Sequence, residues 1–394
     1  MAVSFLRREV SDLCLGKPAL RSLPISATVA DALSALKRSG DNYLSVWSCD
    51  HSSRKKTDFD EDCRCVGKVC MVDIICFLCR EENLSRPSVA LQSPVSDLLP
   101  KVPGLVRHLD PQSSLLEAID YILEGAQNLV VPIESYISLN SRKKLLKKPS
   151  LLCSTLHNGH EYCWLTQEDV IRFLLNSIGI FSPIPTCTIE SLNIIDAGVM
   201  TISYKDPASS ALASISRALT EQTSIAVIDE DNKLIGEISP STLAFCDETA
   251  AAAITTLLAG DLMAYIDCAG PPEDLIQLVK ARLEEKKLGA MLELMEEFSL
   301  SSLSSSSGSS SDEEFGSSRS SGSPVRRSEA IVCHPWSSLV AVMIQAITHR
   351  VSYAWVIEED YSLIGIVTFA GMLKVLRSIA GAWRRPDREN SFKK

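Results

Sequence analysis

The side chains best suited to metal chemistry flank the polar stretch between residues 50 and 62. Cys49 and His51 stand at its start, and Cys63 and Cys65 follow it, on the two sides of one predicted hairpin. Residues two apart in a strand face the same side, so these four soft ligands could converge tetrahedrally on Zn²⁺. Their Cys-x-His and Cys-x-Cys spacings are looser than the Cys-x-x-Cys pairs of zinc modules, and core thiols without a metal are the alternative. We therefore assign no metal ligand and leave open whether these residues bind zinc.

A second pattern places an acidic residue three positions after the residue that opens a helix. It occurs as Thr166 with Asp169, and as Cys70 with Asp73, where a thiol replaces the hydroxyl. Such a pair can form a capping box, in which each side chain accepts a hydrogen bond from the backbone N–H of the other residue. A cap without any ligand therefore stays an alternative to every binding role assigned to these residues below.

Recognisable catalytic patterns are missing from the sequence. It has no Gly-x-x-x-x-Gly-Lys-Ser/Thr loop, no Gly-x-Gly-x-x-Gly after a strand and no His-Glu-x-x-His helix. The 6 His are dispersed, and His157-Asn-Gly-His160 is typical of a turn. Because nothing supplies a nucleophile, a base and an orienting group together, we predict that the protein is not an enzyme.

The chain positions these residues with a composite unit that recurs four times. Each copy has a Ser or Thr before an amphipathic helix, then a short apolar strand, then a second strand that ends in a polar residue. A further helix completes a β-α-β-β-α order, and one unit cannot bury its own apolar face, so neighbouring units must pair. The residues that open the first helix of each unit are Thr28, Ser114, Ser210 and Ser338.

This unit resembles the cystathionine β-synthase (CBS) domain family, whose signature joins a Leu-Pro-Val-Val-Asp-like strand to Gly-apolar-Val-Thr-x-x-Asp-Leu. The match is strongest in the second copy, with Val130-Val-Pro132, Thr166 and Asp169, and in the fourth, with Leu363-Ile-Gly-Ile-Val-Thr368. Four copies in tandem resemble the plant CBS-domain-only proteins, which are similar to the γ regulatory subunit of AMP-activated and SNF1-type kinases. The resemblance implies an α/β fold of four repeats paired into two Bateman-type modules, first with second and third with fourth.

The resemblance also implies adenine nucleotides bound between paired repeats. In the family, the Asp of the second strand's motif contacts the ribose, and a carboxylate can accept from two neighbouring hydroxyls at once. The third and fourth repeats carry Thr242 and Gly371 instead of this carboxylate, so the first module is the expected site. The candidate ligand-binding residues are Asp73, Thr166, Asp169, Ser239 and Thr368.

Residues that would contact a ligand's phosphates cannot be assigned by motif. Lys68, Arg107 and His108 are candidates by charge and position, and an ordinary solvated surface role is the alternative for each.

Composition shifts divide the chain. The divisions are 10–82 for the first repeat, 95–178 for the second, 190–248 for the third, 249–298 for a helical connector, 299–328 for a Ser-rich segment and 329–382 for the fourth repeat. The Ser-rich segment is too poor in apolar residues to offset its ordering entropy, so we expect it to be disordered. Acidic residues after Ser309, Ser310 and Ser311, and a proline after Ser323, also make it a candidate for phosphorylation. Residues 50–62 and 135–160 are expected to be mobile loops.

The composition limits compartment and partners. With 394 residues, 45% of them hydrophobic, the chain can build two cores, and no apolar run reaches the roughly 18 residues of a membrane span. A net charge of −10 argues against nucleic acid as a partner, and 13 scattered Cys fit reduced core thiols. We expect a cytoplasmic protein, with the nucleus as the alternative, and no membrane partner.

The sequence therefore predicts a non-catalytic regulatory protein that binds an adenine nucleotide, such as AMP or ATP, or a related adenosyl ligand. It would hold no permanent cofactor and would modulate a protein partner, for which the resemblance implies a protein kinase. The alternative is a ligand-free interaction scaffold regulated through its phosphorylatable Ser-rich segment.

Overall fold

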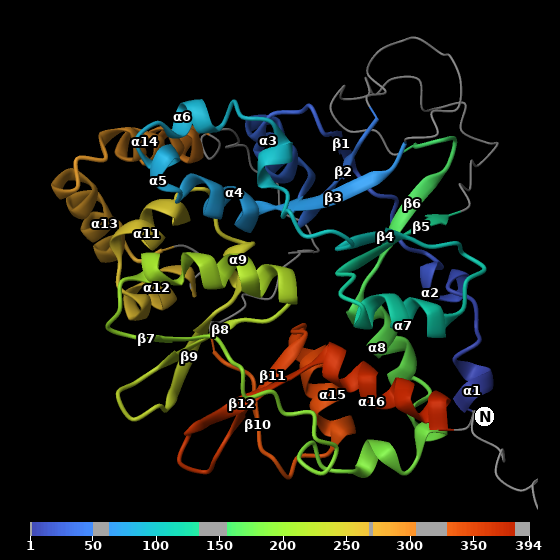
Figure 1. The fold of residues 1–394 in the computed structure, drawn as a ribbon. Helices are drawn as coiled ribbons and strands as arrows, with labels where there is room; N and C mark the ends of the chain where they lie inside the picture. The colour runs from blue at the N-terminus through green and yellow to red at the C-terminus, as the bar shows by residue number, and fades with distance from the viewer. Residues whose placement is uncertain (1, 50–62, 134–155, 268–270, 305–328, 383–394) are drawn as a thin grey trace, which may run out of the picture.

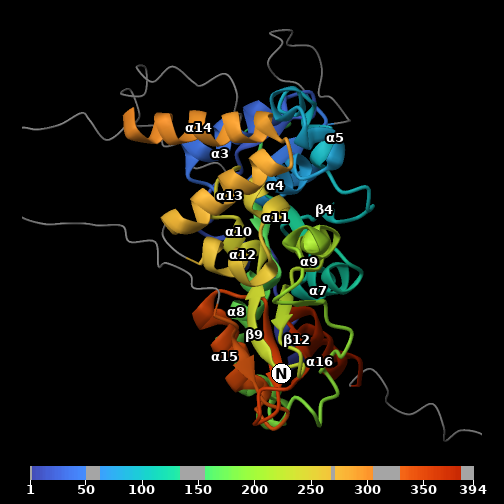
Figure 2. The same cartoon turned by 90° about the vertical axis from the view of Figure 1, so that its left-hand side faces the viewer.

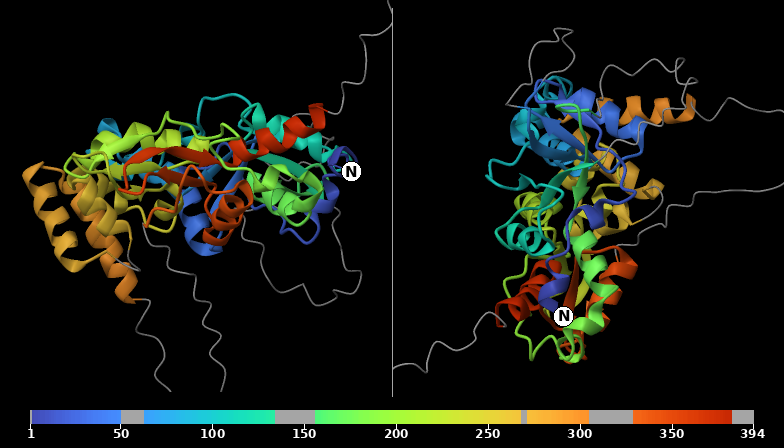
Figure 3. Two further views of the ribbon diagram at one scale, coloured as in Figure 1. Left: turned by 90° about the horizontal axis from the view of Figure 1, so that it is seen from below. Right: turned by 90° about the vertical axis from the view of Figure 1, so that its right-hand side faces the viewer.

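The computed structural model describes residues 2–49, 63–133, 156–267, 271–304 and 329–382. Four three-stranded sheets are formed, one by each repeat. In every sheet the first strand runs parallel to the second, and the second runs antiparallel to the third. The four units lie beside one another in a flattened body, seen face-on in Figure 1 and edge-on in the left view of Figure 3.

All four repeats follow the predicted β-α-β-β-α order. The first consists of β1 (Ser22–Pro24), α3 (Val29–Ser39), β2 (Tyr43–Trp47), β3 (Cys65–Cys70) and α4 (Met71–Leu78). The second consists of β4 (Val106–His108), α7 (Leu115–Leu123), β5 (Asn128–Ile133), β6 (Glu161–Leu165) and α8 (Gln167–Leu175). The third consists of β7 (Thr201–Ser203), α9 (Leu212–Glu221), β8 (Ile225–Ile228), β9 (Leu234–Ile238) and α10 (Pro240–Leu243). The fourth consists of β10 (Val332–Cys333), α15 (Leu339–His349), β11 (Tyr353–Ile357), β12 (Leu363–Thr368) and α16 (Phe369–Ala382).

Short helices and single turns connect the repeats. Before and within the first module they are α1 (Ala2–Phe5), α2 (Ser11–Cys14), α5 (Glu81–Leu84), α6 (Pro87–Ala90) and the 3-10 turn η1 (Val95–Leu98). Between and within the second they are η2 (Ile178–Phe181), η3 (Ile184–Thr186), η4 (Ala208–Ala211), α11 (Ala250–Thr256), α12 (Ala259–Ile266), α13 (Glu273–Glu285) and α14 (Gly289–Ser304). Within the described residues, no helix is both long and apolar enough to cross a membrane.

The predicted helix caps are confirmed in three repeats and wrong in the third. The side chains of Thr28, Ser114 and Ser338 each accept a hydrogen bond from a backbone N–H in the first turn of α3, α7 and α15. Ser210 lies inside the turn η4, and its hydroxyl donates to the carbonyl of Pro207 at 2.7 Å. Because that 3-10 turn precedes α9, the N-cap position falls on Ala211, which has no capping side chain.

The sheets pair as predicted, first with second and third with fourth. One apolar cluster joins Trp47 and Cys65 of the first repeat to Val130 of the second. Another joins Ala226 of the third repeat to Trp355 of the fourth. The two-module arrangement is therefore confirmed at the level of the sheets.

The helices pair differently, which corrects the expectation that only adjacent copies bury one another's faces. One large core contains helices of the first and third repeats, and a second contains those of the second and fourth. A partly exposed ion pair from Arg377 of α16 to Asp120 of α7, at 2.7 Å, bridges the two helices at the edge of the second core. Each repeat presents one apolar face on its sheet and another on its helices, so it needs a partner on both sides.

The stretch that precedes each module packs on that module's second repeat. Phe5, Leu6 and Val10 belong to the core of the second and fourth repeats, although residues from 10 onward were assigned to the first. The second module has the same arrangement. Ile189, in the stretch before that module, donates its N–H to the carbonyl of Ser337, just before α15 of the fourth repeat. The internal duplication therefore includes these leading segments as well as the sheets.

The expected connector is helical and packs mainly on the core of the first and third repeats. Val279 and Leu283 of α13 and Met291 of α14 are buried there, and Figure 2 shows both helices beside the first repeat. Helix α14 continues to Ser304, six residues into the segment expected to be disordered. Residues 305–328 with the candidate phosphorylation sites, 50–62 and 135–155 lie outside the described residues.

We predict that the two modules unfold together, because each helical core spans both. Leu373 of α16 is fully buried between the second and fourth repeats. Leu373→Ala should lower the free energy of unfolding by about 2 to 5 kcal/mol while calorimetry still shows one transition. Ile344→Ala, at a position 49% exposed on α15, is the control and should change it by less than about 1 kcal/mol. Two separate transitions, only one of them shifted by Leu373→Ala, would contradict the shared core.

Candidate ligand-binding site

A cavity of about 1270 Å³ lies where the four repeats meet. Equivalent positions of the repeats converge on it, at the start of the second strand and at the last residue of the third strand or the residue that follows it. The second strands supply Tyr43, Asn128 and Tyr353, and the ends of the third strands supply Cys70, Thr166 and Ser239. The fold therefore gathers residues from all four copies around one space.

Side chain to backbone hydrogen bonds tie the repeats together along the cavity wall. Gln222, which ends α9 in a left-handed conformation, donates through Nε2 to the carbonyl of Gln127 at 2.9 Å. The carbonyl of Gln222 in turn accepts from the hydroxyl of Ser352. The second, third and fourth repeats are thus joined by hydrogen bonds at the cavity.

The cavity offers cationic and aromatic groups. Its cations are Lys37, Lys68, Arg172 and Arg350, and its aromatic side chains are Tyr43, Trp164, Phe245 and Tyr353. Lys37 pairs with Glu248 at 2.6 Å, and Arg172 pairs with Glu168 at 2.5 Å. Among the described residues Lys68 makes no ion pair, and its ammonium lies over the ring of Tyr43, 4.3 Å from the centroid. Burial lowers the pKa of Lys68. An anionic ligand would oppose this effect, because a nearby negative charge favours the charged ammonium.

Thr166 lines the cavity, and its motif forms the capping box. Asp169 Oδ2 accepts from the Thr166 N–H at 2.8 Å and from its hydroxyl at 2.7 Å. Lys17 also reaches this carboxylate at 2.5 Å and donates to the carbonyl of Trp164. A ribose at Asp169 would therefore have to bind the other carboxylate oxygen, Oδ1, or displace Lys17. The motif alone does not reveal that Lys17 is a partner of Asp169.

Asp73 lies at a second, smaller cavity of about 140 Å³, which also includes Lys68, Gly67 and Leu219. Its carboxylate accepts from the N–H of Cys70 at 2.8 Å, so the cap predicted for this pair is present. Burial raises the pKa of Asp73 to about 6, and hydrogen bonds from Cys70 partly oppose this rise. Lys68 lines both cavities and thereby connects the candidate carboxylate to the central space.

The candidates of the second module differ from each other. Ser239 lines the central cavity, where its hydroxyl is buried and lies 3.2 Å from that of Tyr353. Thr368 is not among the residues around either cavity and accepts from the N–H of Gly371 at 3.2 Å. The structure therefore brings Thr166 and Ser239 to one space and places Asp73 beside it. Asp169 and Thr368 are not among the residues around either cavity, and both take part in a helix cap.

Of the three phosphate candidates, Lys68 lines both of the cavities described above, and Arg107 and His108 line neither of them. Arg107 pairs with Glu124 at 2.8 Å and lies over the ring of Tyr121. His108 accepts from the N–H of Cys65 through Nε2 and packs against Trp47 between two sheets. Burial lowers the pKa of His108, which favours its neutral form.

Sequence reasoning missed Arg350, Asn128 and Tyr353. No ligand motif contains them, since each lies just before or at the start of a second strand. Aligning those starts across the four repeats would have identified the ring of positions around the cavity.

Comparison with known proteins gives one strong relationship. No family model matches the chain. It is 50% identical over 393 residues to the CBS domain-containing protein CBSX5 of Arabidopsis thaliana, across 96% of this chain and 98% of that protein. It is 20% identical over 402 residues to the SNF1-related protein kinase regulatory subunit gamma-like PV42b of the same plant, across 94% of each.

Among solved structures, the fold resembles that of a Methanocaldococcus jannaschii protein described as a proposed archaeal homologue of γ-AMPK. The TM-score is 0.54 at 15% identity, and the match covers 93% of this chain and 99% of the other. A likeness at this identity shows the fold alone, which is a chain of paired repeats.

We predict that the raised pKa of Asp73 makes the protein less stable as pH rises from about 4 to about 6. The unfolded chain loses its Asp73 proton near pH 3.8, whereas the native state keeps it to about pH 6, so deprotonation favours unfolding in that window. Asp73→Asn should remove this contribution. The free energy of unfolding of the variant, relative to that of the unmodified protein, should therefore increase from about pH 4 to about pH 6 and stay constant above that. Urea unfolding at pH 4.5 and 7 measures it.

Asp31→Asn is the matched control, since Asp31 forms the same capping box at the start of α3. An equal pH-dependent change in both variants would assign the effect to the lost cap and not to the burial of Asp73.

Proposed function

Because the chain belongs to the family of CBS domain-containing proteins, we propose that it is a non-catalytic regulatory protein. In this proposal the central cavity binds an adenine nucleotide or a related adenosyl ligand, and the bound state alters the action of a protein partner. The observation that carries the proposal is the cavity where the four repeats meet, with Lys68 and aromatic rings in its wall.

The cavity offers a counterpart for each part of a nucleotide. Lys68 lies within it without an ion pair among the described residues and would face the phosphates, where charge-assisted hydrogen bonds are strong. Tyr43 and Phe245, which are 38% and 59% exposed, offer apolar faces to a flat purine. The volume of about 1270 Å³ exceeds the roughly 300 to 1,000 Å³ of common ligand pockets, so space is sufficient.

The ribose is assigned to the carboxylate of Asp169 or Asp73, as the motifs suggest. Asp73 adjoins Lys68 at the smaller cavity, and Asp169 stands one helical turn from Thr166. Both carboxylates already accept local hydrogen bonds, so a ribose would add to a cap and not replace it.

Ligand binding at this place would reach every repeat. A ligand that contacts two or more repeats stabilises the arrangement in which those contacts form, and a partner that prefers that arrangement binds better. We propose a protein kinase of the SNF1 type as the partner, because the relative PV42b is named a regulatory subunit of such a kinase. We place the protein in the cytoplasm, with the nucleus as the alternative.

A second candidate function is a scaffold that binds no nucleotide, with the Ser-rich segment as its regulated part. This function is favoured by the fact that motif residues already have hydrogen-bond and ion-pair partners within the protein. Asp169 is held by Thr166 and Lys17, and the fourth repeat has Gly371 where a carboxylate would stand. These groups then serve the fold, and the cavity is only the space left between four units.

Calorimetric titration of the full chain with AMP, ADP, ATP and S-adenosylmethionine separates the two functions. We expect at least one of them to bind, and Lys68→Ala to weaken a phosphate-bearing ligand by roughly 10- to 150-fold, the value of a hydrogen bond to a charged group. Lys374→Ala, at an exposed position of α16, is the matched control and should not change the affinity. Absence of binding by all four compounds would support the scaffold instead.

Asp169→Asn tests the ribose assignment. We expect adenosyl affinity to fall by a similar factor of roughly 10 or more, because the amide cannot accept from both hydroxyls as a carboxylate does. Asp31→Asn removes an equivalent capping carboxylate at the start of α3, where no ribose contact is proposed, and should leave affinity unchanged. If both variants bind like the unmodified protein while circular dichroism stays native, Asp169 is a cap only.

A further inference from the structure

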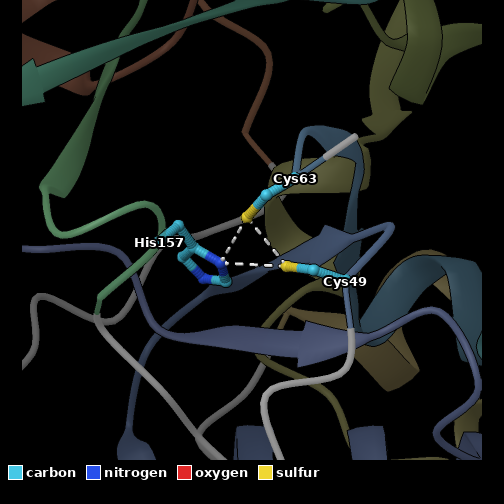
Figure 4. A group of neighbouring side chains, drawn as sticks. All are labelled: Cys49, Cys63 and His157. Carbon is cyan, nitrogen blue, oxygen red and sulfur yellow. Dashed lines mark hydrogen bonds between the residues drawn. The ribbon is translucent and has the colours of Figure 1, made fainter. Parts of the chain in front are cut away.

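Two thiols and an imidazole meet between the sheets of the first and second repeats, as Figure 4 shows. Cys49 follows β2, Cys63 precedes β3, and His157 precedes β6. The two sulfurs lie 3.0 Å apart, and His157 Nδ1 lies 3.3 Å from Cys49 Sγ and 3.5 Å from Cys63 Sγ. Within the described part of the chain, this is the one place where at least three such ligand atoms gather.

The imidazole is held so that Nδ1 faces the sulfurs. His157 and His160 exchange backbone hydrogen bonds of 2.9 Å across a tight turn, which confirms the turn predicted from this sequence. Asn158 and Gly159 occupy its centre with φ of 49° and 80°, the left-handed region that Asn-Gly turns require. The ring stacks on Trp47 with centroids 3.5 Å apart, and its Nε2 lies 2.8 Å from the hydroxyl of Ser22.

We propose that Cys49, Cys63 and His157 bind one Zn²⁺ ion. The ion would bind the Nδ1 lone pair and two thiolates, and their two protons would be released to solvent. In the tautomer that binds the ion through Nδ1, Nε2–H would donate to the Ser22 hydroxyl 2.8 Å away, and such an outer hydrogen bond is the usual way in which proteins orient a metal-binding histidine.

The geometry fits a tetrahedral ion. With Zn–S bonds of about 2.3 Å and Zn–N bonds of about 2.0 Å, neighbouring ligand atoms are roughly 3.5 to 3.8 Å apart, so the sulfurs need to separate by less than about 1 Å. All three residues are buried, with at most 7% of any one exposed, and two thiolates neutralise the charge of the ion. A neutral centre avoids the desolvation cost of an unpaired buried charge. The ion would take its fourth ligand from water or from another donor.

The proposal changes the set considered from the sequence. Cys65 is not in the group, because its thiol donates to the carbonyl of Gly67 at 3.3 Å. His51 lies outside the described residues. His157, from the second repeat, joins Cys49 and Cys63 instead, so the ion would link the first repeat's hairpin to the second repeat and pin the sheet interface of the first module.

Metal analysis of the full chain, purified with a thiol reductant and dialysed against Zn²⁺ and then buffer, tests the site. We expect close to one zinc per chain by mass spectrometry, and less than about a tenth of that in Cys49→Ser, Cys63→Ser and His157→Phe. His157→Phe keeps a ring for Trp47 but has no ligand atom. Cys65→Ser is the matched control, two residues from Cys63, and should retain the metal.

Two results would overturn the proposal. One is unmodified protein without zinc after this treatment, including protein found to carry a Cys49–Cys63 disulfide. The other is a loss of zinc in Cys65→Ser as large as that in Cys63→Ser.

Titration with Co²⁺ keeps the test independent of whether the variants fold. The unmodified chain, stripped by a chelator, should develop the absorption bands of tetrahedral cobalt bound to thiolate, and the bands should disappear on addition of Zn²⁺. A spectrum without thiolate-to-cobalt bands would place any bound metal elsewhere.

Discussion

Each repeat of this chain has an apolar face on its sheet and a second one on its helices, and the rest of the structure depends on burying both. The sheets meet as first with second and third with fourth, whereas the helices meet as first with third and second with fourth. The four copies therefore form a closed assembly, because a repeat with two apolar faces needs two neighbours to bury both of them. The central cavity is a geometric consequence of this closure.

Closure brings equivalent positions of the first three repeats to the centre, but the copies have diverged there. Thr166 and Ser239 keep hydroxyls, Cys70 has a thiol, and Thr368 is not part of the cavity wall. Where carboxylates persist, they are also structural, because Asp73 and Asp169 each accept from the backbone of their own helix start. A carboxylate proposed to bind ligand in this fold is thus also a helix cap. Comparing its substitution with that of a capping residue without a proposed ligand contact, such as Asp31, separates the two roles.

The two sheet interfaces solve the same problem with different chemistry. In the second module the buried carboxylate of Glu237 accepts from Tyr353 at 2.9 Å and from Trp355 at 2.7 Å. The first module has Lys68 at the position of Glu237, and its sheet interface contains Trp47, His157 and the thiols of Cys49 and Cys63 at the hairpin end of β2 and β3. Buried polar groups need partners, which hydrogen bonds supply to Glu237 and which the proposed metal ion would supply to the thiols and to His157.

The sequence by itself determined the repeat, its strands and most of its helix starts. A cap such as Thr28 or Ser114 acts within three residues, and apolar periodicity acts within one element, so both are readable locally. Ser210 failed as a cap because a 3-10 turn displaced the helix start. Tertiary structure alone decided that Lys17 reaches Asp169, and that His157 meets Cys49 from 108 residues away. Those contacts depend on how separate units pack, which no spacing within a unit encodes.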